Sequence, residues 1–335
     1  MRARRVITVL KPQFDVYAIT RDDHYKSNHM LDQEHVFLIR PKNTRVWIIK
    51  IMPYILFNKF DLIICESDFY AFASYWFLSK ILKYKIIFEA HGILSKEYAD
   101  AGGGHFKFIF YKFIEKFCIS RSDYVIALSE EIRNAYLKYN NNISLVPVFI
   151  DKVDICHLSQ PTIDAKYIGV IGPFSLIRNK FTLDFISRNI DKFDERINFA
   201  LIGKCDNRVF HPRLSYLGYI SSAKEYLGEV AKLDAVLVLE MIPTSGPLNK
   251  ILEPMSLGVP VFTTPKGAMG LSNLKNGENI FILEESDIIN TINKILFDTG
   301  LMERTGISAK EYVNEYYNID VNSRKLIAII NQLYI

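Results

Sequence analysis

The sequence predicts an α/β protein with parallel, doubly wound sheets in two domains. Short apolar runs typical of buried strands alternate with segments of helical periodicity, and this order favours a parallel sheet covered by helices. The chain has 335 residues, enough for two domains of about 150 residues each. Residues 151–164 lack a clear periodicity, so we place the boundary there. We expect domains at residues 1–155 and 160–320, and a C-terminal helix at residues 321–335.

The first domain begins with a segment that is hard to assign. Residues 6–10 could form a strand or a short helix, and no glycine occurs before Gly92. The elements that follow are clearer, because each apolar run is bounded by polar or turn residues. We expect a helix at residues 69–82, another capped by Ser129, and strands at residues 14–19, 36–39, 61–65, 85–89, 122–128 and 144–150.

The segment at residues 105–119 predicts an aromatic helix that carries several lysines. Phe106, Phe110, Phe113 and Phe117 fall on one face, and the lysines are distributed around the rest. Such a helix can pack in a core while its lysines reach solvent, which we favour, or it can lie in a membrane interface. Residues 45–60 are also apolar and basic, so contact with a membrane surface is a second hypothesis.

The second domain is expected to repeat the alternation of strands and helices. We predict helices at residues 246–257, 287–297 and 323–333, and one that ends near residue 189. Strands are predicted at residues 198–203, 235–239, 259–262 and 280–284, and residues 167–174 read as a strand that runs into a loop. Ligands of open α/β sheets bind beyond the carboxyl ends of the strands, so candidate site residues should follow these strands directly.

The stretch at residues 244–263 is the strongest candidate for a ligand site. We predict that Gly246 and Pro247 open a helix and that Gly258 ends it, because proline suits the first helical position and glycine the C-cap. An apolar stripe should face the sheet, formed by Leu248, Ile251, Leu252 and Met255 at helical spacing.

Three other residues of this predicted helix indicate what the ligand could be. Gly246, Lys250 and Glu253 fall together on the side opposite the apolar stripe. A helix N-terminus and a lysine favour a phosphate, and a carboxylate can accept hydrogen bonds from ribose hydroxyls. The alternative is a solvated helix face with an ordinary lysine–glutamate pair.

The same stretch resembles the donor-site signature of retaining GT-B glycosyltransferases of glycosyltransferase family 4. That signature commonly reads Asn-Lys-x-x-Glu-x-Met-x-x-Gly-x-Pro-Val, and the matching residues are Asn249, Lys250, Glu253, Met255, Gly258, Pro260 and Val261. The chain departs from the pattern at two positions. Ser245 stands where the family often has a second glutamate, and Pro254 directly after Glu253 should kink the helix.

The resemblance implies a GT-B fold, with two Rossmann-like doubly wound domains that face across a cleft and a final helix that returns to the first domain. It implies an enzyme that moves a sugar from a nucleotide-diphosphate sugar to an acceptor hydroxyl of a glycan, a glycolipid or a protein-linked glycan. By the same analogy the transfer is retaining and metal-independent, and no cofactor is expected beyond the nucleotide sugar, which is a substrate.

Site residues are carried over from the family where this sequence matches its motifs. His91 and Gly92 resemble the His-Gly that lines the acceptor side, and Pro173 replaces an arginine of the phosphate clamp, so that Arg178 and Lys180 would serve instead. The resemblance implies catalytic roles for His91, Arg178 and Lys250, and a ribose contact for Glu253. The implied donor-binding set is Gly172, Arg178, Lys180, Gly218, Tyr219, Ser245, Gly246, Pro247, Leu248, Asn249, Lys250 and Glu253.

Composition limits the class of protein and its partners. The formal charge of +4 suits an anionic ligand or a membrane surface and is too small to indicate nucleic acid. The cysteines are scattered without a Cys-x-x-Cys pair, which favours reduced thiols in the cytoplasm; they are Cys65, Cys118, Cys156 and Cys205. We see no signal peptide and no Asp-x-Asp, and we expect no metal site. A cytoplasmic protein, peripheral at the inner membrane face, is the expectation.

Two other functions stay open at this point. A non-catalytic relative of the same fold could bind a nucleotide sugar or a partner, as Ser245, Pro173 and the missing glycine-rich loop near the start suggest. A nucleotide-sugar epimerase could share the fold. Product formation without an acceptor would identify the epimerase, and tight nucleotide binding without turnover would identify the non-catalytic relative.

Overall fold

The computed structural model describes residues 2–21, 36–39, 44–151 and 165–334, and in it the chain divides into two compact units. Unit 1 comprises residues 1–149 and 319–335, and unit 2 comprises residues 150–318. The boundary predicted between residues 155 and 160 lies outside the described ranges, as does Cys156.

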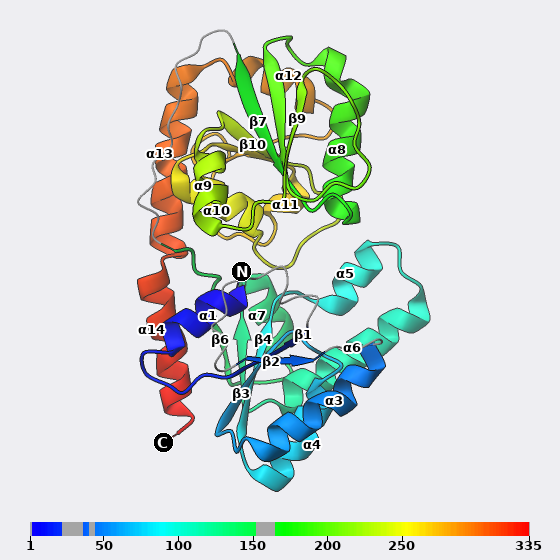
Figure 1. The fold of residues 1–335 in the computed structure, drawn as a ribbon, viewed down its shortest axis with the longest axis vertical. Helices are drawn as coiled ribbons and strands as arrows, with labels where there is room; N and C mark the ends of the chain where they lie inside the picture. The colour runs from blue at the N-terminus through cyan, green and yellow to red at the C-terminus, as the bar shows by residue number, and fades with distance from the viewer. Residues whose placement is uncertain (1, 22–35, 40–43, 152–164, 335) are drawn as a thin grey trace. The chain divides into compact units, whose positions relative to one another are not determined.

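Unit 1 is built on a parallel sheet in the order β3-β4-β5-β6, beside which a second parallel pair joins β1 to β2 (Figure 1). The strands are β1 (Ala18–Arg21), β2 (Val36–Ile39), β3 (Leu62–Glu66), β4 (Lys85–Ala90), β5 (Tyr124–Ala127) and β6 (Ile143–Leu145). The helices are α1 (Arg2–Leu10), α3 (Thr44–Phe57), α4 (Phe72–Leu82), α5 (Leu94–Asp100), α6 (His105–Arg121), α7 (Glu130–Tyr136) and α14 (Ile319–Gln332).

The ambiguous start of the chain is helical, because its buried residues are spaced for a helix. Val6 and Leu10 are buried four residues apart in α1, together with Arg2 and Arg5. The predicted cap of α7 is confirmed: the Ser129 hydroxyl accepts a hydrogen bond from the backbone N–H of Ile132 at 3.2 Å.

Helix α6 differs from the core helix that we favoured from its sequence. Its buried residues are Glu115, Cys118 and Ile119, whereas Phe106 and Phe113 are 89% and 67% exposed. Phe117 alone of the four phenylalanines packs inward, edge-on against the rings of α4. The preference for a core position was therefore wrong for most of this aromatic face.

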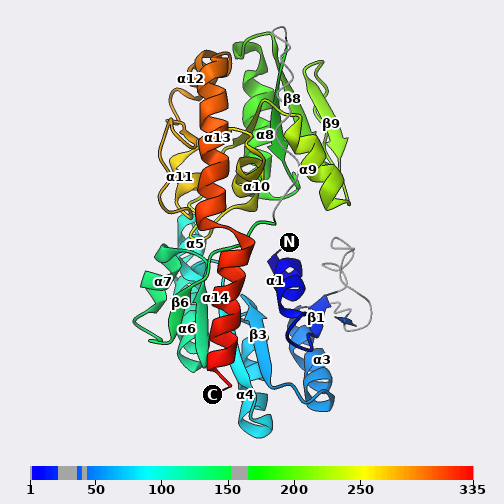
Figure 2. The ribbon, with the colours of Figure 1, turned by 90° about the vertical axis from the view of Figure 1, so that its left-hand side faces the viewer.

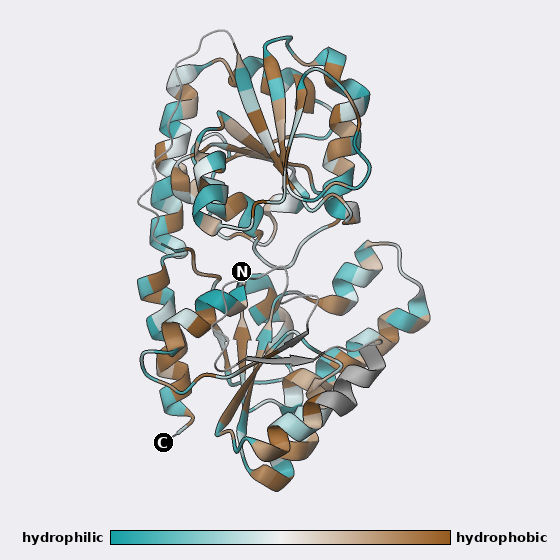
Figure 3. Ribbon diagram, viewed as in Figure 1, coloured by the Kyte–Doolittle hydropathy of each residue, from teal (hydrophilic) through white to brown (hydrophobic). Residues whose placement is uncertain are grey.

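Unit 2 is built on a six-stranded parallel sheet in the order β12-β11-β10-β7-β8-β9, along whose strands hydrophobic residues are prominent (Figure 3). The strands are β7 (Lys166–Ile171), β8 (Ile197–Ile202), β9 (Leu214–Gly218), β10 (Ala235–Val238), β11 (Val261–Thr263) and β12 (Phe281–Ile282). The helices are α8 (Ile177–Asn189), α9 (Ala223–Ala231), α10 (Asn249–Leu257), α11 (Pro265–Ala268), α12 (Ile288–Ile295) and α13 (Thr299–Tyr316), with a short 3₁₀ turn at Ile190–Lys192.

The core of unit 2 forms between the sheet and the helices α8 and α12. Leu183, Ile186 and Ile190 pack in one cluster with Ile288 and Ile292 against the buried side chains of the strands. Helix α8 contacts β7 and β10, and its first turn reaches the residues that follow those strands, since Asn179 and Arg178 donate to the carbonyls of Pro173 and Ile242.

Helix α13 was not predicted, although it is the longest helix of unit 2 among the described residues. Its sequence contains Gly300 and Gly306 and several charges, which weakens a helical pattern read from apolar spacing. Gly306 explains the position of α13 beside α10 (Figure 2). A Cβ atom on it would lie 2.2 Å from the carbonyl oxygen of Gly258, so the two helices approach more closely than a side chain allows.

Candidate functional site

The predicted donor loop leads into α10, but the helix begins later than the sequence indicated. Leu248 is its N-cap in an extended conformation and Asn249 is its first residue, so Gly246 and Pro247 lie in the preceding loop. The prediction that they open the helix was wrong. Gly258 ends the helix as predicted, with a left-handed φ of 85°. Pro254 lies inside α10, which continues to Leu257.

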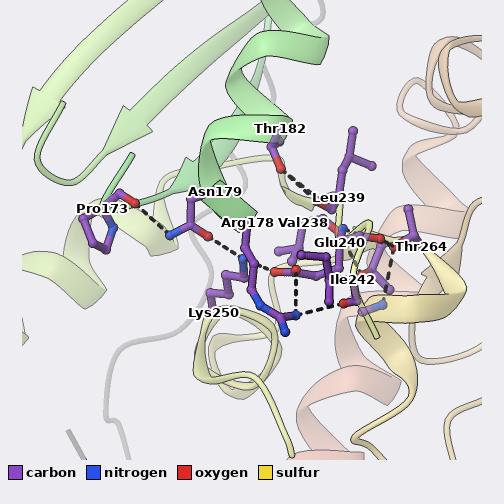
Figure 4. A network of polar contacts seen from close by, with 12 residues as sticks. Pro173, Arg178, Asn179, Thr182, Val238, Leu239, Glu240, Ile242, Lys250 and Thr264 are labelled. Atoms are coloured by element: carbon purple, nitrogen blue, oxygen red, sulfur yellow. Dashed lines mark hydrogen bonds and ion pairs between the residues drawn. The ribbon is translucent and has the colours of Figure 1, made fainter. Parts of the chain in front are cut away.

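Lys250 and Glu253 do not lie on a solvated helix face, which was the alternative that the sequence left open. Glu253 is 2% exposed, and the side chain of Lys250 is 15% exposed. The ammonium of Lys250 contacts Glu240, at 2.5 Å from Oε1, and donates to Asn179 Oδ1 at 2.6 Å. Lys250 is thus held inside unit 2 by partners from other elements, as Figure 4 shows.

Glu240 is the centre of this network and is completely buried two residues after β10. Its backbone fixes it, because its N–H donates to the Thr264 hydroxyl at 3.2 Å and its carbonyl accepts from the same hydroxyl at 2.7 Å. Its second carboxylate oxygen lies 3.5 Å from Arg178 Nη1. One buried carboxylate is therefore shared by the two cations that the sequence analysis assigned to the donor phosphates.

The burial of this network changes the ionisation of the lysine. Removal from water lowers the pKa of Lys250, while the charge of Glu240 and the contact with it act in the opposite direction. The pKa of Lys250 is lowered overall, because burial outweighs Glu240 and the positive charge of Arg178 acts in the same direction as burial.

The first turn of α8 supplies the other side of the network. Arg178 Nη1 donates to the carbonyl of Ile242 at 2.8 Å, and the Asn179 amide donates to the carbonyl of Pro173 at 3.0 Å. Asn179 is buried and joins Pro173 to Lys250, whereas Lys180 is exposed. The structure thus brings Arg178 and Lys250 together on Glu240 and leaves Lys180 directed toward solvent.

Three glycines line the carboxyl ends of β7, β8 and β9, and two of them were predicted donor-binding residues. Gly172 N–H donates to Ile202 at 2.7 Å, and Gly203 N–H donates to Gly218 at 2.7 Å. A Cβ atom on Gly203, whose φ is 131°, would lie 2.9 Å from the Cα atom of Gly172. Glycine is therefore required for this close approach. The next predicted residue, Tyr219, has an exposed side chain.

The loop before α10 contains buried polar atoms that the described residues do not satisfy. Thr244 Oγ1 and Asn249 Oδ1 are buried and have no hydrogen-bond partner within the described ranges. Ser245 is also buried in this loop. Buried polar atoms are almost always hydrogen-bonded, so unsatisfied ones beside two cations indicate a place for a polar ligand.

The backbone of this loop is held from the opposite side by Gly270. A Cβ atom there would lie 2.1 Å from the carbonyl oxygen of Gly246. Only a residue without a side chain permits this contact, so Gly270 fixes the path of the loop that carries Ser245 and Pro247.

The predicted acceptor-side residues lie in unit 1, directly after β4. His91 Nε2 lies 2.8 Å from Glu89 Oε1, and the His91 backbone N–H donates to the Ser67 hydroxyl at 2.8 Å. Glu89 is completely buried and forms an ion pair with Arg2 at 2.9 Å. The Glu97 carboxylate lies over Gly92, at 2.5 Å from where a Cβ atom of residue 92 would be.

Sequence reasoning missed Glu240, Glu89 and Gly270. Two of them left a readable signal: each glutamate is an acidic residue at the carboxyl end of an apolar strand, the position where ligand sites of parallel sheets form. Gly270 left none, because only the folded chain brings it against residue 246.

Two features are absent from the residues that the structure describes. No three histidine, cysteine or acidic side chains there gather closely enough to hold a metal ion. No helix within the same ranges has the length and apolar character needed to cross a membrane.

Comparisons with known proteins bear on both units. A family model described as Glycosyltransferase Family 4 matches residues 12–153. No curated protein matched the chain. Among solved structures, Anabaena HepE in complex with UDP has a TM-score of 0.74 at 18% identity, with 98% of this chain and 95% of that chain covered.

Two further solved structures are similar over nearly the whole chain. Sucrose-phosphate synthase from Thermosynechococcus elongatus has a TM-score of 0.78 at 16% identity, covering 99% of this chain and 92% of that one. The lipopolysaccharide outer core galactosyltransferase WaaB in its apo form has a TM-score of 0.64 at 13% identity, covering 99% and 94%. The predicted fold class is confirmed: this chain has the GT-B fold of two parallel-sheet α/β domains, and its residues 12–153 match glycosyltransferase family 4.

Proposed function

We propose that this protein is a glycosyltransferase that moves a sugar, of the hexose or a related class, from a nucleotide-diphosphate sugar to an acceptor hydroxyl. The observation that carries the proposal is the group of Arg178, Lys250 and Glu240 beside a loop with unsatisfied buried polar atoms. Support comes from the fold shared with HepE, which was solved with UDP.

The network has the charges that departure of a nucleoside diphosphate requires. When the bond from the sugar to the diphosphate breaks, negative charge increases on the leaving phosphate oxygens. Preorganised cations in a site shielded from water stabilise that charge most effectively. Arg178 and Lys250 are preorganised by Glu240 and Asn179, so they need little rearrangement when charge develops. We assign to Glu253 the acceptance of hydrogen bonds from the ribose hydroxyls.

The finer features of the reaction belong to the same proposal. We propose retention of configuration, no requirement for a metal or other cofactor, and an acceptor on a glycan, a glycolipid or a protein-linked glycan. The nucleotide sugar and this acceptor would be the partners, with no nucleic acid. Free Cys65, Cys118 and Cys205 support a cytoplasmic location.

A double substitution separates nucleotide binding from folding. Glu240→Gln with Lys250→Met removes both members of the closer ion pair, and so avoids leaving the Lys250 ammonium buried without its carboxylate. We expect the variant to fold and to bind nucleoside diphosphate 10-fold to 100-fold more weakly, about 1–3 kcal/mol, because a hydrogen bond to a charged group is lost. Isothermal titration calorimetry with the nucleoside diphosphate that stabilises the wild-type protein, in the presence of EDTA, measures this.

The experiment also needs a choice of nucleotide and a control variant. A thermal-shift screen of UDP, GDP, ADP and CMP identifies the base, because a ligand at 100 times its dissociation constant adds about 2.7 kcal/mol. Lys192→Ala is the matched control, since Lys192 is exposed just after the opposite end of α8. Equal affinity in the double variant, or no shift with any nucleotide, would contradict the proposed donor site.

Peripheral contact with a membrane is part of the proposal, and α6 supports it. Ile109, Phe110 and Phe113 are exposed on the helix, as is Phe106 near its start. Lys107, Lys112 and Lys116 are exposed on the same helix. Exposed aromatic side chains among lysines complement the acyl boundary and the anionic headgroups of a bilayer.

Substitutions on α6 test this contact without touching the core. We expect Phe110→Ser with Phe113→Ser to reduce binding to vesicles of phosphatidylcholine with phosphatidylglycerol at least 5-fold, because apolar area enters the bilayer. Cosedimentation measures the bound fraction. Phe210→Ser is the control, since Phe210 is 92% exposed in unit 2 and should leave binding unchanged. Equal binding of the double variant would refute the contact through α6.

A further inference from the structure

The environment of His91 contains a buried ion pair that the proposed function does not yet use. Arg2 donates to both carboxylate oxygens of Glu89, through Nε at 3.0 Å and Nη2 at 2.9 Å. Its guanidinium also lies 4.2 Å from the centre of the Phe149 ring. Both charged side chains are removed from water, whereas about a third of the His91 side chain remains exposed.

A buried pair of this kind stabilises a fold little, because the cost of desolvation offsets the attraction. The pair instead fixes the orientation of the Glu89 carboxylate. With both oxygens held by Arg2, the Glu89 carboxylate cannot rotate, and Oε1 remains 2.8 Å from His91 Nε2. The contact fixes the plane of the imidazole ring and places the proton on Nε2.

The other ring nitrogen is available for a ligand. Nδ1 of His91 has no hydrogen-bond partner among the described residues. It lies at the carboxyl end of β4, the edge of a parallel sheet at which ligands bind. In an imidazolium Nδ1 donates a hydrogen bond, and in a neutral ring with the proton on Nε2 it accepts one.

We infer that Glu89 is a positioning residue that orients His91 and presents its Nδ1 atom to a hydroxyl of the acceptor, and that Arg2 holds Glu89 in place. This inference rests on the proposed function for the identity of the hydroxyl. The orientation itself rests on the contacts of Arg2, Glu89 and His91.

Other charged groups around the ring act on its proton. Glu89 lies on the strand that precedes His91, Glu66 lies at the end of the adjacent strand β3, Arg2 reaches the site from α1, and Glu97 of α5 lies over Gly92. Burial lowers the pKa of His91, but the hydrogen bond and charge of Glu89, together with Glu66, outweigh burial and raise it overall. Burial also disfavours ionised Glu89, but Arg2 and His91 hold its pKa well below the usual range.

The test is an NMR titration of His91 in the full-length protein without substrate. The chain has seven histidines, so His91→Asn identifies the signal of interest. In the wild-type protein we expect the ring to titrate above pH 6.5, with the proton on Nε2 in the neutral form. Glu89→Gln should lower this pKa, because the hydrogen bond and the charge that raise it are lost, and Arg2→Lys should lower it by less.

A second variant keeps the inference testable if Glu89→Gln does not fold. Glu66→Gln changes a residue outside the Arg2 pair, and it should lower the His91 pKa without changing the protonated nitrogen. A wild-type pKa near 6.5, or one that neither Glu89→Gln nor Glu66→Gln changes, would overturn the inference. So would a neutral ring protonated on Nδ1.

Kinetics then separate this inference from the proposed function. If the wild-type protein transfers sugar, Glu89→Gln should reduce kcat at least 10-fold and change the dissociation constant of the donor nucleotide by less than 2-fold. An unchanged kcat would overturn the positioning role. If the wild-type protein neither binds nucleotide nor turns over, the proposed function fails, while the titration still decides whether Glu89 orients His91.

Discussion

Replacement of Glu240 by alanine is expected to lower the free energy of unfolding by about 3–5 kcal/mol, the largest stability effect we predict. The carboxylate is completely buried and is the counterion of both Lys250 and Arg178. Its removal leaves a buried ammonium that must either lose its proton or remain unpaired. Chemical denaturation followed by circular dichroism measures the change in both units.

The design of that measurement follows from the positions of the tryptophans. Both tryptophans, Trp47 and Trp76, belong to unit 1, so their fluorescence does not report on unit 2. Hydrogen exchange of β10 and α10 locates the loss of stability. The matched control is Glu229→Ala, which breaks a surface pair with Lys232 on α9 and should cost less than about 1 kcal/mol. A similar cost for Glu229→Ala and Glu240→Ala would refute the central role of Glu240.

Glu66→Gln is expected to stabilise the protein at alkaline pH relative to wild type. Burial, followed by the negative charge of Glu89, raises the pKa of Glu66 from 4.5 to about 7. The folded protein therefore binds a proton more tightly than the unfolded chain does. The stability that this proton contributes is complete below about pH 4.5 and is lost as the pH rises through about 7.

A glutamine at position 66 does not titrate, so the stability of the Glu66→Gln variant does not fall as the pH rises through about 7. Between pH 5 and pH 8 the free energy of unfolding of Glu66→Gln should rise by about 2–3 kcal/mol relative to wild type. Here tryptophan fluorescence is the suitable probe, since it reports on unit 1. Asp100→Asn, at an exposed position of α5, should leave the difference near zero at both pH values. A pH-independent difference for Glu66→Gln would show that Glu66 ionises normally.

The sequence predicted the parallel sheets well, because each strand depends on a local run of apolar residues. Residues 36–39 form β2 with the predicted bounds, and residues 85–89 lie within β4. The cap at Ser129 could also be predicted, because the hydroxyl and the N–H that it binds are three residues apart. Helix α13 could not, since it is positioned by a glycine contact with another helix rather than by its own apolar pattern.

The candidate site was predicted in its residue types but not in its contacts. The motif placed Lys250 on a helix after a strand, and helical periodicity placed it opposite the apolar stripe, away from the core. Its position in the folded protein is decided by Glu240, ten residues earlier, and by Asn179 from α8. No local pattern relates these residues, so the burial of Lys250 could be seen only in the folded chain. The same holds for Glu89, whose partner Arg2 is 87 residues away.

The shared carboxylate of Glu240 also affects how strongly the site attracts an anionic ligand from solvent. A buried carboxylate that pairs with both cations weakens the electric field that they project into solvent, so a nucleotide bound at the proposed site would be attracted over only a short range. Capture should then depend little on ionic strength, in contrast to sites built from exposed lysines, where salt screens the approach. Selectivity at this site would accordingly depend on a low dissociation rate constant for the matching nucleotide rather than on a high association rate constant for anions in general.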